Sequence, residues 1–588
     1  NTGTFFLQAS DYQLPDISGA LEIVRTYNTQ SSVADGPFGK GWEFAYSQKL
    51  ELYTDGTIGY RAQDGTLTIF KPKGDGTFSG GEEAHRTLSA DRKTREYRVS
   101  EQDTSASVFN MQLGWLKRVE DRFGNAVTIE RAENGFLSAI VTKSGARLAI
   151  TMDENGHITQ IGLPDGSTLN YTYSGDNLVS YTDALNNKTK YAYDRKGRMT
   201  KWFDAAGTQQ VENTYDDLDR VIFQTDAQKG EYSLSYGEGE TTVTDALGQT
   251  SMVYYDAQFR TVEEIDARGN TTRYYYDDKG NLTGTTDAYG KLTSSDYDER
   301  GNQVKNVLPD GTVSTKTYDG NNNLTSYTDG NGHTSAYTYD AKNNLLSTTL
   351  AAGGTTTYAY NEKGQLVSAT DAAGYVIRYE YAGANLIRTI DALGNESLFE
   401  YDSLGRMIRA TDPLGNKTRY TYDATGNLVK MTLPNGAETT YAYDALGNRI
   451  SSIDQMGNET KYEYDALSRL VSTTFADGTK QTAEYDYNGN VVKATDTLGN
   501  VTSATYDKAG NRTSATDEAG NTTTYAYDKR NRLVKETLPT GASNTYVYNL
   551  ETGLVDRSTD AYGITTEYQY DKAGNLVKRT LANGAVYQ

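Results

Sequence analysis

The sequence contains no cysteine, and histidine, proline and tryptophan are scarce. Without cysteine, neither a disulfide framework nor a cysteine-ligated metal site is possible. The three histidines, His85, His157 and His333, stand far apart in unrelated contexts, so they offer no spacing typical of a metal site or of a nucleophile with its base. We therefore expect no enzyme activity, no catalytic, metal-binding or cofactor-binding residues, and no cofactor.

Long apolar runs are also missing. No stretch reaches the length needed to cross a membrane, and no charged-then-apolar signal segment opens the chain. Because the sequence starts at Asn1 and stops in mid-pattern at Gln588, we expect it to be a piece of a longer protein whose targeting signals lie elsewhere. Basic residues are outnumbered, 57 against 78 acidic ones, and the net charge of −21 would repel a polyanion, so we expect no nucleic-acid partner.

Glycine and tyrosine are abundant instead, with 57 Gly and 48 Tyr in 588 residues. Only 36% of residues are hydrophobic and the mean hydropathy is −0.69, which argues against a solid core of ordinary proportions. This composition favours many short strands joined by tight turns. The sequence also repeats with a fixed period, which argues against disorder.

One unit repeats through most of the chain and is clearest at 415–465. Tyr-Asp pairs end at Asp423, Asp444 and Asp465, a step of 21 residues, and each unit holds another turn between them, such as 454–457. We name the turn that begins at the Tyr-Asp aspartate the YD turn, and the other one the second turn. Both read Asp-x-x-Gly-Asn or a close variant, in which Asp accepts backbone hydrogen bonds and Gly takes a positive φ.

The residues between the turns alternate with a period of two, which is typical of a β-strand. In 458–464 one face carries Asn458, Thr460, Tyr462 and Tyr464, and the other carries Glu459, Lys461 and Glu463. Isolated hairpins are marginal in water, so neighbouring hairpins must pair with one another. We predict an all-β fold in which tandem hairpins of about 21 residues form one long spiral antiparallel sheet, a hollow or partly open shell or barrel, with tyrosine rings packed as a ladder on its concave side.

Three regions differ in texture. Residues 1–72 predict a small amino-terminal β module with turns at Asp55-Gly56 and Asp64-Gly65, residues 73–120 predict transitional strands and a loop, and residues 121–588 hold the repeat array, regular from about 173. Phe38 and Trp42 in the module either plug an open sheet edge, the interpretation we favour, or stack on a sugar.

Acidic pairs and Asn-rich turns are candidates for chemistry. Asp216-Asp217 and Asp277-Asp278 are better explained as turn residues than as a glycosidase pair. The stretches 319–323 and 329–333 offer oxygen ligands at alternating positions, loosely like a calcium loop, but both lack the closing bidentate acid. We therefore interpret both as turns.

The tyrosine face leaves three functions open: a scaffold that forms the wall of a shell, a carbohydrate-binding surface, or an adhesive stalk. A scaffold requires inward-facing rings, whereas a lectin needs some rings exposed in pockets. The exposure of Tyr420, Tyr441, Tyr462 and Tyr525 distinguishes the first two.

The repeated units resemble a known family. Tyr443-Asp444-Ala445-Leu446-Gly447-Asn448-Arg449 and Tyr527-Asp528-Lys529-Arg530-Asn531-Arg532-Leu533 are similar to the YD repeats of the Rhs family, which are shared with insecticidal toxin-complex subunits and animal teneurins. The strand Arg25-Thr26-Tyr27-Asn28 and the loop Gly39-Lys40-Gly41-Trp42 resemble that family's amino-terminal module. The resemblance covers nearly the whole chain.

The resemblance implies a spiral β-sheet wound into a shell that, in bacterial polymorphic toxins, encloses a carboxy-terminal toxin until delivery. It implies a non-catalytic scaffold of a larger secreted or cell-surface bacterial protein, with the toxin as its partner. A carbohydrate or cell-surface receptor is the alternative partner. The sequence departs from the family in lacking an Arg-Tyr-Tyr-Asp-Pro ending, the self-cleaving aspartate site that follows it, and a toxin domain. The cargo is therefore expected in the parent protein.

Overall fold

The computed structural model describes residues 3–17, 21–31, 36–61, 67–74, 77–80, 86–101 and 105–587. Within these ranges nearly all regular structure is β, apart from one 3-10 turn, η1 (Ala45–Ser47). None of the helical structure in the described part of the chain is long and apolar enough to span a bilayer. The predicted turn at Asp64-Gly65 and His85 lie outside the described residues.

Two small sheets precede the long one. The first, which we call the amino-terminal sheet, has the order β1-β2-β3, and the second has the order β4-β5-β6-β7. Gly56 has a φ of +83° in the turn between β4 and β5, as predicted. The strands are β1 (Phe6–Leu14), β2 (Leu21–Asn28), β3 (Trp42–Phe44), β4 (Lys49–Leu52), β5 (Ile58–Arg61), β6 (Leu67–Pro72) and β7 (Phe78–Ser79).

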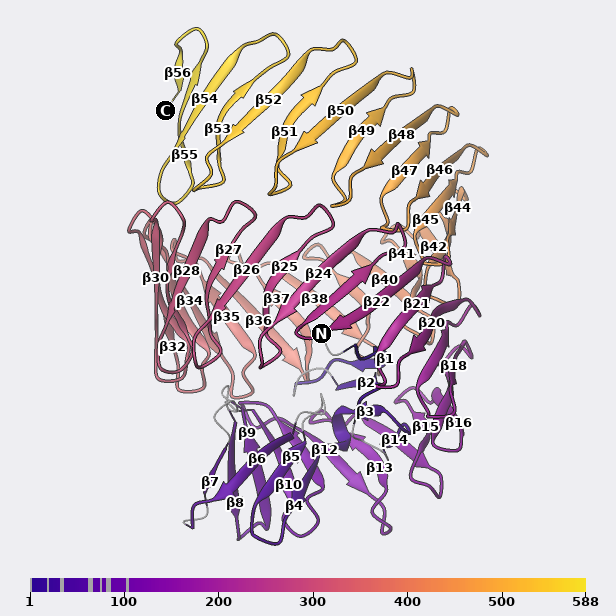
Figure 1. The fold of residues 1–588 in the computed structure, drawn as a ribbon. Helices are drawn as coiled ribbons and strands as arrows, with labels where there is room; N and C mark the ends of the chain where they lie inside the picture. The colour runs from indigo at the N-terminus through magenta and orange to yellow at the C-terminus, as the bar shows by residue number, and fades with distance from the viewer. Residues whose placement is uncertain are drawn as a thin grey trace.

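A single antiparallel sheet of 49 strands runs from β8 (Thr87–Asp91) to β56 (Val586–Tyr587). Each strand pairs with the next in sequence, and no pairing between β56 and β8 closes the sheet in the part of the chain that the structure describes. The sheet winds as a spiral, with the late yellow and orange strands above the magenta ones (Figure 1). The predicted all-β spiral of paired hairpins is confirmed.

Each regular unit consists of one six-residue strand, one five-residue strand and two five-residue turns. In one unit these strands are β40 (Lys417–Tyr422) and β41 (Leu428–Thr432), with a register shift at Tyr422 next to the YD turn. The strands are short because each turn takes five residues of the 21, as from Asp423 to Asn427.

The two faces of the strands differ as predicted. In β40, Tyr420 and Tyr422 are half-buried, whereas the alternate residues Lys417, Arg419 and Thr421 are exposed. We call the side that carries the tyrosines the tyrosine face. Because directly paired residues share a face, this side continues from strand to strand along the sheet.

Successive windings of the spiral meet along a seam between the two kinds of turn. Second turns of the earlier winding contact YD turns of the later one. Arg268 donates to the Asn531 side-chain oxygen at 2.7 Å, and Asn331 donates to Asp571 at 2.8 Å. These partners are 263 and 240 residues apart, so the repeat pattern alone gives no sign of which turns meet.

Apolar burial concentrates near the start of the long sheet. The cluster of buried hydrophobic side chains joins the two small sheets to the strands up to Val221, with Leu404 added from the later winding. The later array is a wall one sheet thick. Strands β8 to β11 (Leu116–Glu120) already belong to the long sheet. The division of the chain into 1–72, 73–120 and 121–588 stays a proposal.

Candidate functional site: the tyrosine face of the wall

The YD aspartate holds its own turn together. The Oδ1 atom of Asp444 accepts hydrogen bonds from the backbone N–H groups of Leu446 and Asn448, both at 2.9 Å, and its Oδ2 atom accepts one from the Asn448 side-chain amide at 3.0 Å. Gly447 donates to the Asp444 carbonyl at 3.1 Å. One carboxylate thus satisfies three donors of a tight turn, as predicted for the backbone donors.

Some turns keep this geometry without glycine. Ser468 and Asn531 stand at the glycine position with φ values of +59° and +61°. Asn tolerates this region better than Ser, because its short amide bonds locally. The turn is therefore determined by the aspartate and the strand pairing as well as by glycine.

The YD tyrosine anchors the preceding strand. The Tyr443 hydroxyl donates to the Leu428 carbonyl at 2.9 Å, and Tyr527 donates to the Arg512 carbonyl at 3.0 Å, each bond spanning 15 residues. The acceptor is the first residue of the neighbouring strand, at the register shift of the preceding hairpin. Burial raises the pKa of Tyr443, so this hydroxyl stays protonated as a donor at neutral pH.

The other tyrosines of each unit are neither buried nor fully exposed. Tyr420, Tyr441, Tyr462 and Tyr525 are all half-buried. The predicted ladder of ring contacts is wrong for the regular units: in the described residues, ring pairs extend only as far as Tyr193. Equivalent tyrosines lie two strands apart, about 10 Å, which exceeds the range of ring contact.

Arginine fills part of the space between these rings. The Arg449 guanidinium carbon lies 4.8 Å from the Tyr462 ring centre and 5.7 Å from that of Tyr441. A guanidinium over an aromatic face is attractive, so it links rings that cannot touch each other.

A second class of arginine joins consecutive units at the YD turns. Arg469 donates to Asp465 Oδ2 in its own turn at 2.7 Å and to the Asp486 carbonyl of the next YD turn at 2.9 Å. Its guanidinium carbon also lies 4.7 Å from the Tyr485 ring centre. Units with Asn at this position, such as Asn448, close the turn without this set of contacts to the next unit.

The amino-terminal sheet packs on the tyrosine face. Phe38 and Trp42 are 0% exposed. The Phe38 ring lies 4.9 Å from that of Tyr171, and the Trp42 indole donates to the Tyr193 hydroxyl at 3.0 Å. Both rings are buried against the tyrosine face rather than shown to plug an open sheet edge, and their full burial leaves no ring surface on which a sugar could stack.

A buried ion pair fixes this packing. Arg25 is fully buried and donates to Asp11 Oδ1 at 2.7 Å, while the Tyr171 hydroxyl donates to Asp11 Oδ2 at 2.8 Å. The Arg25 guanidinium carbon lies 4.7 Å from the Trp42 ring centre. Burial, together with the Asp11 charge, raises the pKa of Tyr171 well above its usual value. Such a pair tolerates burial because further hydrogen bonds surround it.

This role of Arg25 was not predicted from the sequence, although Arg25 belongs to the motif Arg25-Thr26-Tyr27-Asn28. Arg25 follows the buried apolar residues Ile23 and Val24, and this was the available signal, since a buried arginine requires a partner. The partner, Asp11, lies in a strand whose pairing the analysis did not predict.

Asn125 connects three parts of the molecule. It lies in a second turn of the first winding, and its side-chain amide is 3.4 Å from the Ile17 carbonyl and 3.3 Å from the Lys363 carbonyl of the later winding. The segment after β1 thus reaches the seam. The amino-terminal sheet, the first winding and the later winding are therefore connected at Asn125.

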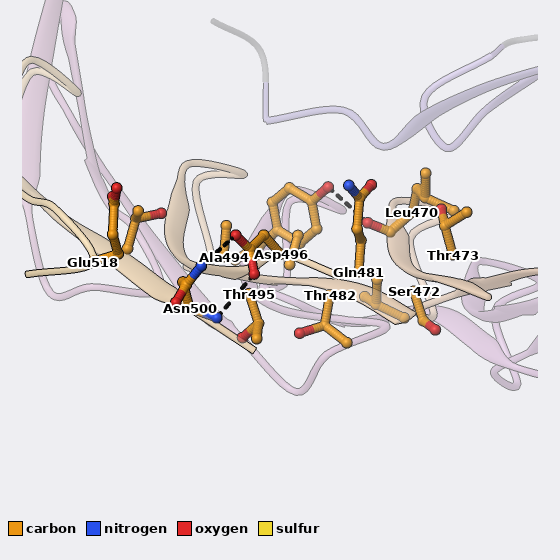
Figure 2. A pocket seen from close by; sticks show the side chains of 14 residues that line it. Leu470, Ser472, Thr473, Gln481, Thr482, Ala494, Thr495, Asp496, Asn500 and Glu518 are labelled. Carbon is orange, nitrogen blue, oxygen red and sulfur yellow. Dashed lines mark hydrogen bonds between the residues drawn. The ribbon is translucent and has the colours of Figure 1, made fainter. Parts of the chain in front are cut away.

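A recess interrupts the tyrosine face in two successive units. One part of it, about 400 Å³, is lined by Ala483 and Ala494, and an adjoining part of about 370 Å³ shares Ala494 and reaches Ala504 and Ala515. Figure 2 shows Gln481, Ala494 and Glu518 pointing to the same side of the strands. The strands beneath are β45 (Leu470–Thr474), β46 (Lys480–Tyr485), β47 (Val491–Thr495), β48 (Val501–Tyr506) and β49 (Arg512–Thr516).

The acidic candidates lie in turns. Asp216 Oδ1 accepts from the backbone of Leu218 and Arg220, and Asp277 accepts from Asn281 in the same manner. Both carboxylates are thus engaged in their own turns.

The calcium candidates are turns of the same kind. Asp319 binds the backbone and side chain of Asn323, and Asn331 is used in the seam. His157 is buried and stacks on Tyr173 at 4.6 Å, whereas the His333 side chain is 64% exposed beside Asp329. The described residues contain no group of three or more acidic, histidine or cysteine side chains suited to a metal ion.

Comparison with known proteins agrees with this geometry. The RHS repeat model matches eleven segments from 255–292 to 548–586, which together cover more than half of the chain. Residues 1–70 match a domain of unknown function, DUF6531.

The similar curated proteins include "tRNA nuclease WapA" of Bacillus subtilis and "tRNA3(Ser)-specific nuclease WapA" of Bacillus spizizenii. Each is 34% identical over 275 residues, which is 45% of this chain. The chain spans only 11% of the length of these relatives.

Solved structures show the same fold at low identity. The crystal structure of TcdB2-TccC3-TEV has a TM-score of 0.61 at 14% identity, over 98% of this chain and 45% of that one. The Photorhabdus luminescens Tc holotoxin pore has a TM-score of 0.52 at 16% identity, over 78% of this chain and 30% of that one. The repeats matched along the sequence and the spiral sheet that they build show together that the chain belongs to the RHS repeat family.

Proposed function

We propose that this chain forms the wall of a shell that encloses the toxin portion of a larger secreted or cell-surface bacterial protein, and that the wall itself contributes no catalysis. The observation that carries the proposal is the placement of the amino-terminal sheet on the tyrosine face, where it covers one region of a one-layer spiral wall. A wall built in this way has one protected side.

The relatives support the choice of cargo. The curated relatives are named as tRNA nucleases, and the similar structures come from Tc toxin assemblies. The tyrosines on the protected side are half-buried and their YD hydroxyls are bonded to the wall, so that side combines apolar rings with satisfied polar groups. Such a lining tolerates both a polypeptide and water.

The reading frame beyond Gln588 and a protease experiment test the proposal. The chain is expressed with its natural continuation and treated with a protease that digests the continuation when it is made alone. We expect the continuation to resist digestion while the wall is intact and to be digested after urea opens the wall. Digestion at the same rate with and without the wall would overturn the proposal.

A further inference from the structure

The recess in the tyrosine face coincides with missing tyrosines. The position held by Tyr441 and Tyr462, and again by Tyr525, is Ala483 and Ala504 in the two units between them. The residue paired across the strand is also alanine in both, since Ala483 pairs with Ala494 and Ala504 pairs with Ala515. In flanking units the corresponding pairs are Tyr462 with Thr473 and Tyr525 with Glu536.

A third small residue at this position has the same consequence. Val253 takes the tyrosine position two residues before Tyr255, and it lines a separate cavity of about 380 Å³ with Glu264 and Thr272. Cavities thus lie at three units in which Ala483, Ala504 or Val253 takes the place of this ring. A ring occupies the space in flanking units such as those of Tyr462 and Tyr525, which indicates the size and shape of a group that fits.

The two ends of the recess differ in charge. Asp496, Asp517 and Glu518 line the end at the second turns. Hydrogen bonds from the Asn500 amide and backbone lower the pKa of Asp496, so it is ionised at neutral pH. Arg512 lines the opposite end, where its guanidinium carbon lies 4.9 Å from the Tyr525 ring centre. The acidic end favours a cation beside the group that enters.

We infer that the alanine-floored recess is a binding site for an aromatic side chain of an enclosed polypeptide, next to a lysine or arginine of that polypeptide. The ring takes the place of the omitted tyrosines on the methyl groups of Ala483, Ala494 and Ala504, and the neighbouring cation lies near Asp496 and Glu518. This inference rests on the proposed enclosing function, because the recess opens on the side of the wall that carries the amino-terminal sheet.

Filling the recess tests the inference directly. The double variant Ala483→Tyr, Ala504→Tyr restores the residue that neighbouring units carry, so the wall should fold as before. The matched control, Ala442→Tyr with Ala526→Tyr, adds the same rings to exposed positions on the opposite face. Circular dichroism and thermal unfolding compare the folding of all three proteins.

Binding is measured with a fluorescein-labelled peptide, Gly-Lys-Phe-Lys-Gly, by fluorescence anisotropy on the full chain. We expect the filled variant to lose about tenfold in affinity and the control to match the wild type. Peptides with Ala in place of Phe, or with Glu in place of both Lys, should bind more weakly to the wild type. Equal affinity of the wild type and the filled variant would overturn the inference.

Two further outcomes separate this site from its alternatives. Binding of cellohexaose that is lost on filling the recess would assign the site to carbohydrate and overturn the peptide assignment. The protease experiment with the natural continuation separates the two proposals. If the wild type protects the continuation but does not bind the peptide, the recess proposal is wrong and the enclosing function stands. If the wild type does not protect the continuation, the enclosing function is wrong.

Discussion

The two residues of the Tyr-Asp pair act on different parts of the wall. Asp444 organises the turn that follows it, while the Tyr443 hydroxyl reaches back 15 residues to the Leu428 carbonyl. The carbonyl lies at the register shift of the preceding hairpin, where Leu428 pairs with Tyr422. One residue therefore closes the hairpin ahead, and the other ties it to the strand behind.

Removing the YD hydroxyl should weaken one unit. Tyr443→Phe keeps the ring but leaves the Leu428 carbonyl without this donor, and we expect a loss of about 1 kcal/mol in the free energy of unfolding. Urea unfolding followed by tyrosine fluorescence measures the change. Tyr562→Phe, at a side chain that is 90% exposed, serves as the control and should leave stability unchanged.

The turn aspartates predict acid sensitivity. Hydrogen bonds, chiefly from the Asn302 amide, lower the pKa of Asp298 to about 2, against an ordinary value of 3.8. A carboxyl with a lowered pKa stabilises the fold above its unfolded pKa and loses that contribution as the pH falls through its folded pKa. We expect the melting temperature to be steady above about pH 4 and to fall between about pH 4 and 2. A constant melting temperature across this range would contradict the role of the aspartates.

The turn residues were predictable from the sequence, and the long-range contacts were not. The period of 21, the role of Asp444 and the positive φ of Gly447 follow from spacing and residue type. The hydroxyl bond of Tyr443 to the Leu428 carbonyl crosses to the neighbouring strand, and no residue pattern announces it. The predicted ring ladder failed because an intervening strand separates equivalent tyrosines, a distance that period-two alternation does not encode.

At the scale of the hairpin, turn geometry and unit-to-unit contacts decide stability. Gly447 and Gly520 have φ values of +80° and +81°, a region that β-branched residues avoid. Open space surrounds the position of a Cβ at Gly520, so strain there comes from the backbone alone.

Valine at these glycines should loosen the neighbouring hairpins. We expect Gly447→Val and Gly520→Val each to cost about 1 kcal/mol or more and to speed proteolysis at the turn. Gly320→Val is the matched control, because Gly320 does not adopt a positive φ and has open space around its Cβ position. Protease resistance equal to that of the control would count against the turn assignment.

The arginine at the end of some YD turns makes two kinds of contact, one within its own turn and one to the next unit, and a substitution can separate them. Arg469→Asn adopts the residue used at Asn448, so the bond to Asp465 is kept, but the contacts to the Asp486 carbonyl and the Tyr485 ring are lost. We expect a loss of about 1–2 kcal/mol. Hydrogen exchange should increase in the following unit while the Asp465 turn stays protected, and equal exchange in both would contradict the distinction.

At the scale of the whole molecule, the seam turns a ribbon into a wall. Turns 237 to 263 residues apart meet through hydrogen bonds and ion pairs, including the pair between Lys291 and Glu551. Because these side chains are partly exposed, each ion pair contributes little alone, about 0.2–1 kcal/mol. The number of such contacts along the seam, together with the packing at Asn125, determines how firmly the windings hold together.

A charge swap tests the seam. Lys291→Glu should place two acidic side chains across it and increase proteolysis at both turns, and Glu551→Lys combined with Lys291→Glu should restore the wild-type rate. The single variant should differ least from the wild type at high salt, where surface charges are screened. Independent effects of the two substitutions in a double-mutant cycle would show that the residues do not interact in solution.

The seam always sets a second turn against a YD turn, and every unit supplies one of each. Deleting a whole unit would shift each later turn one place along its row of partners, yet every contact would still join the same two kinds of turn. Deleting half a unit would instead set YD turns against YD turns and second turns against second turns. Such a wall can therefore gain or lose whole units. Its length changes in steps of one unit, while each seam contact still joins a second turn to a YD turn.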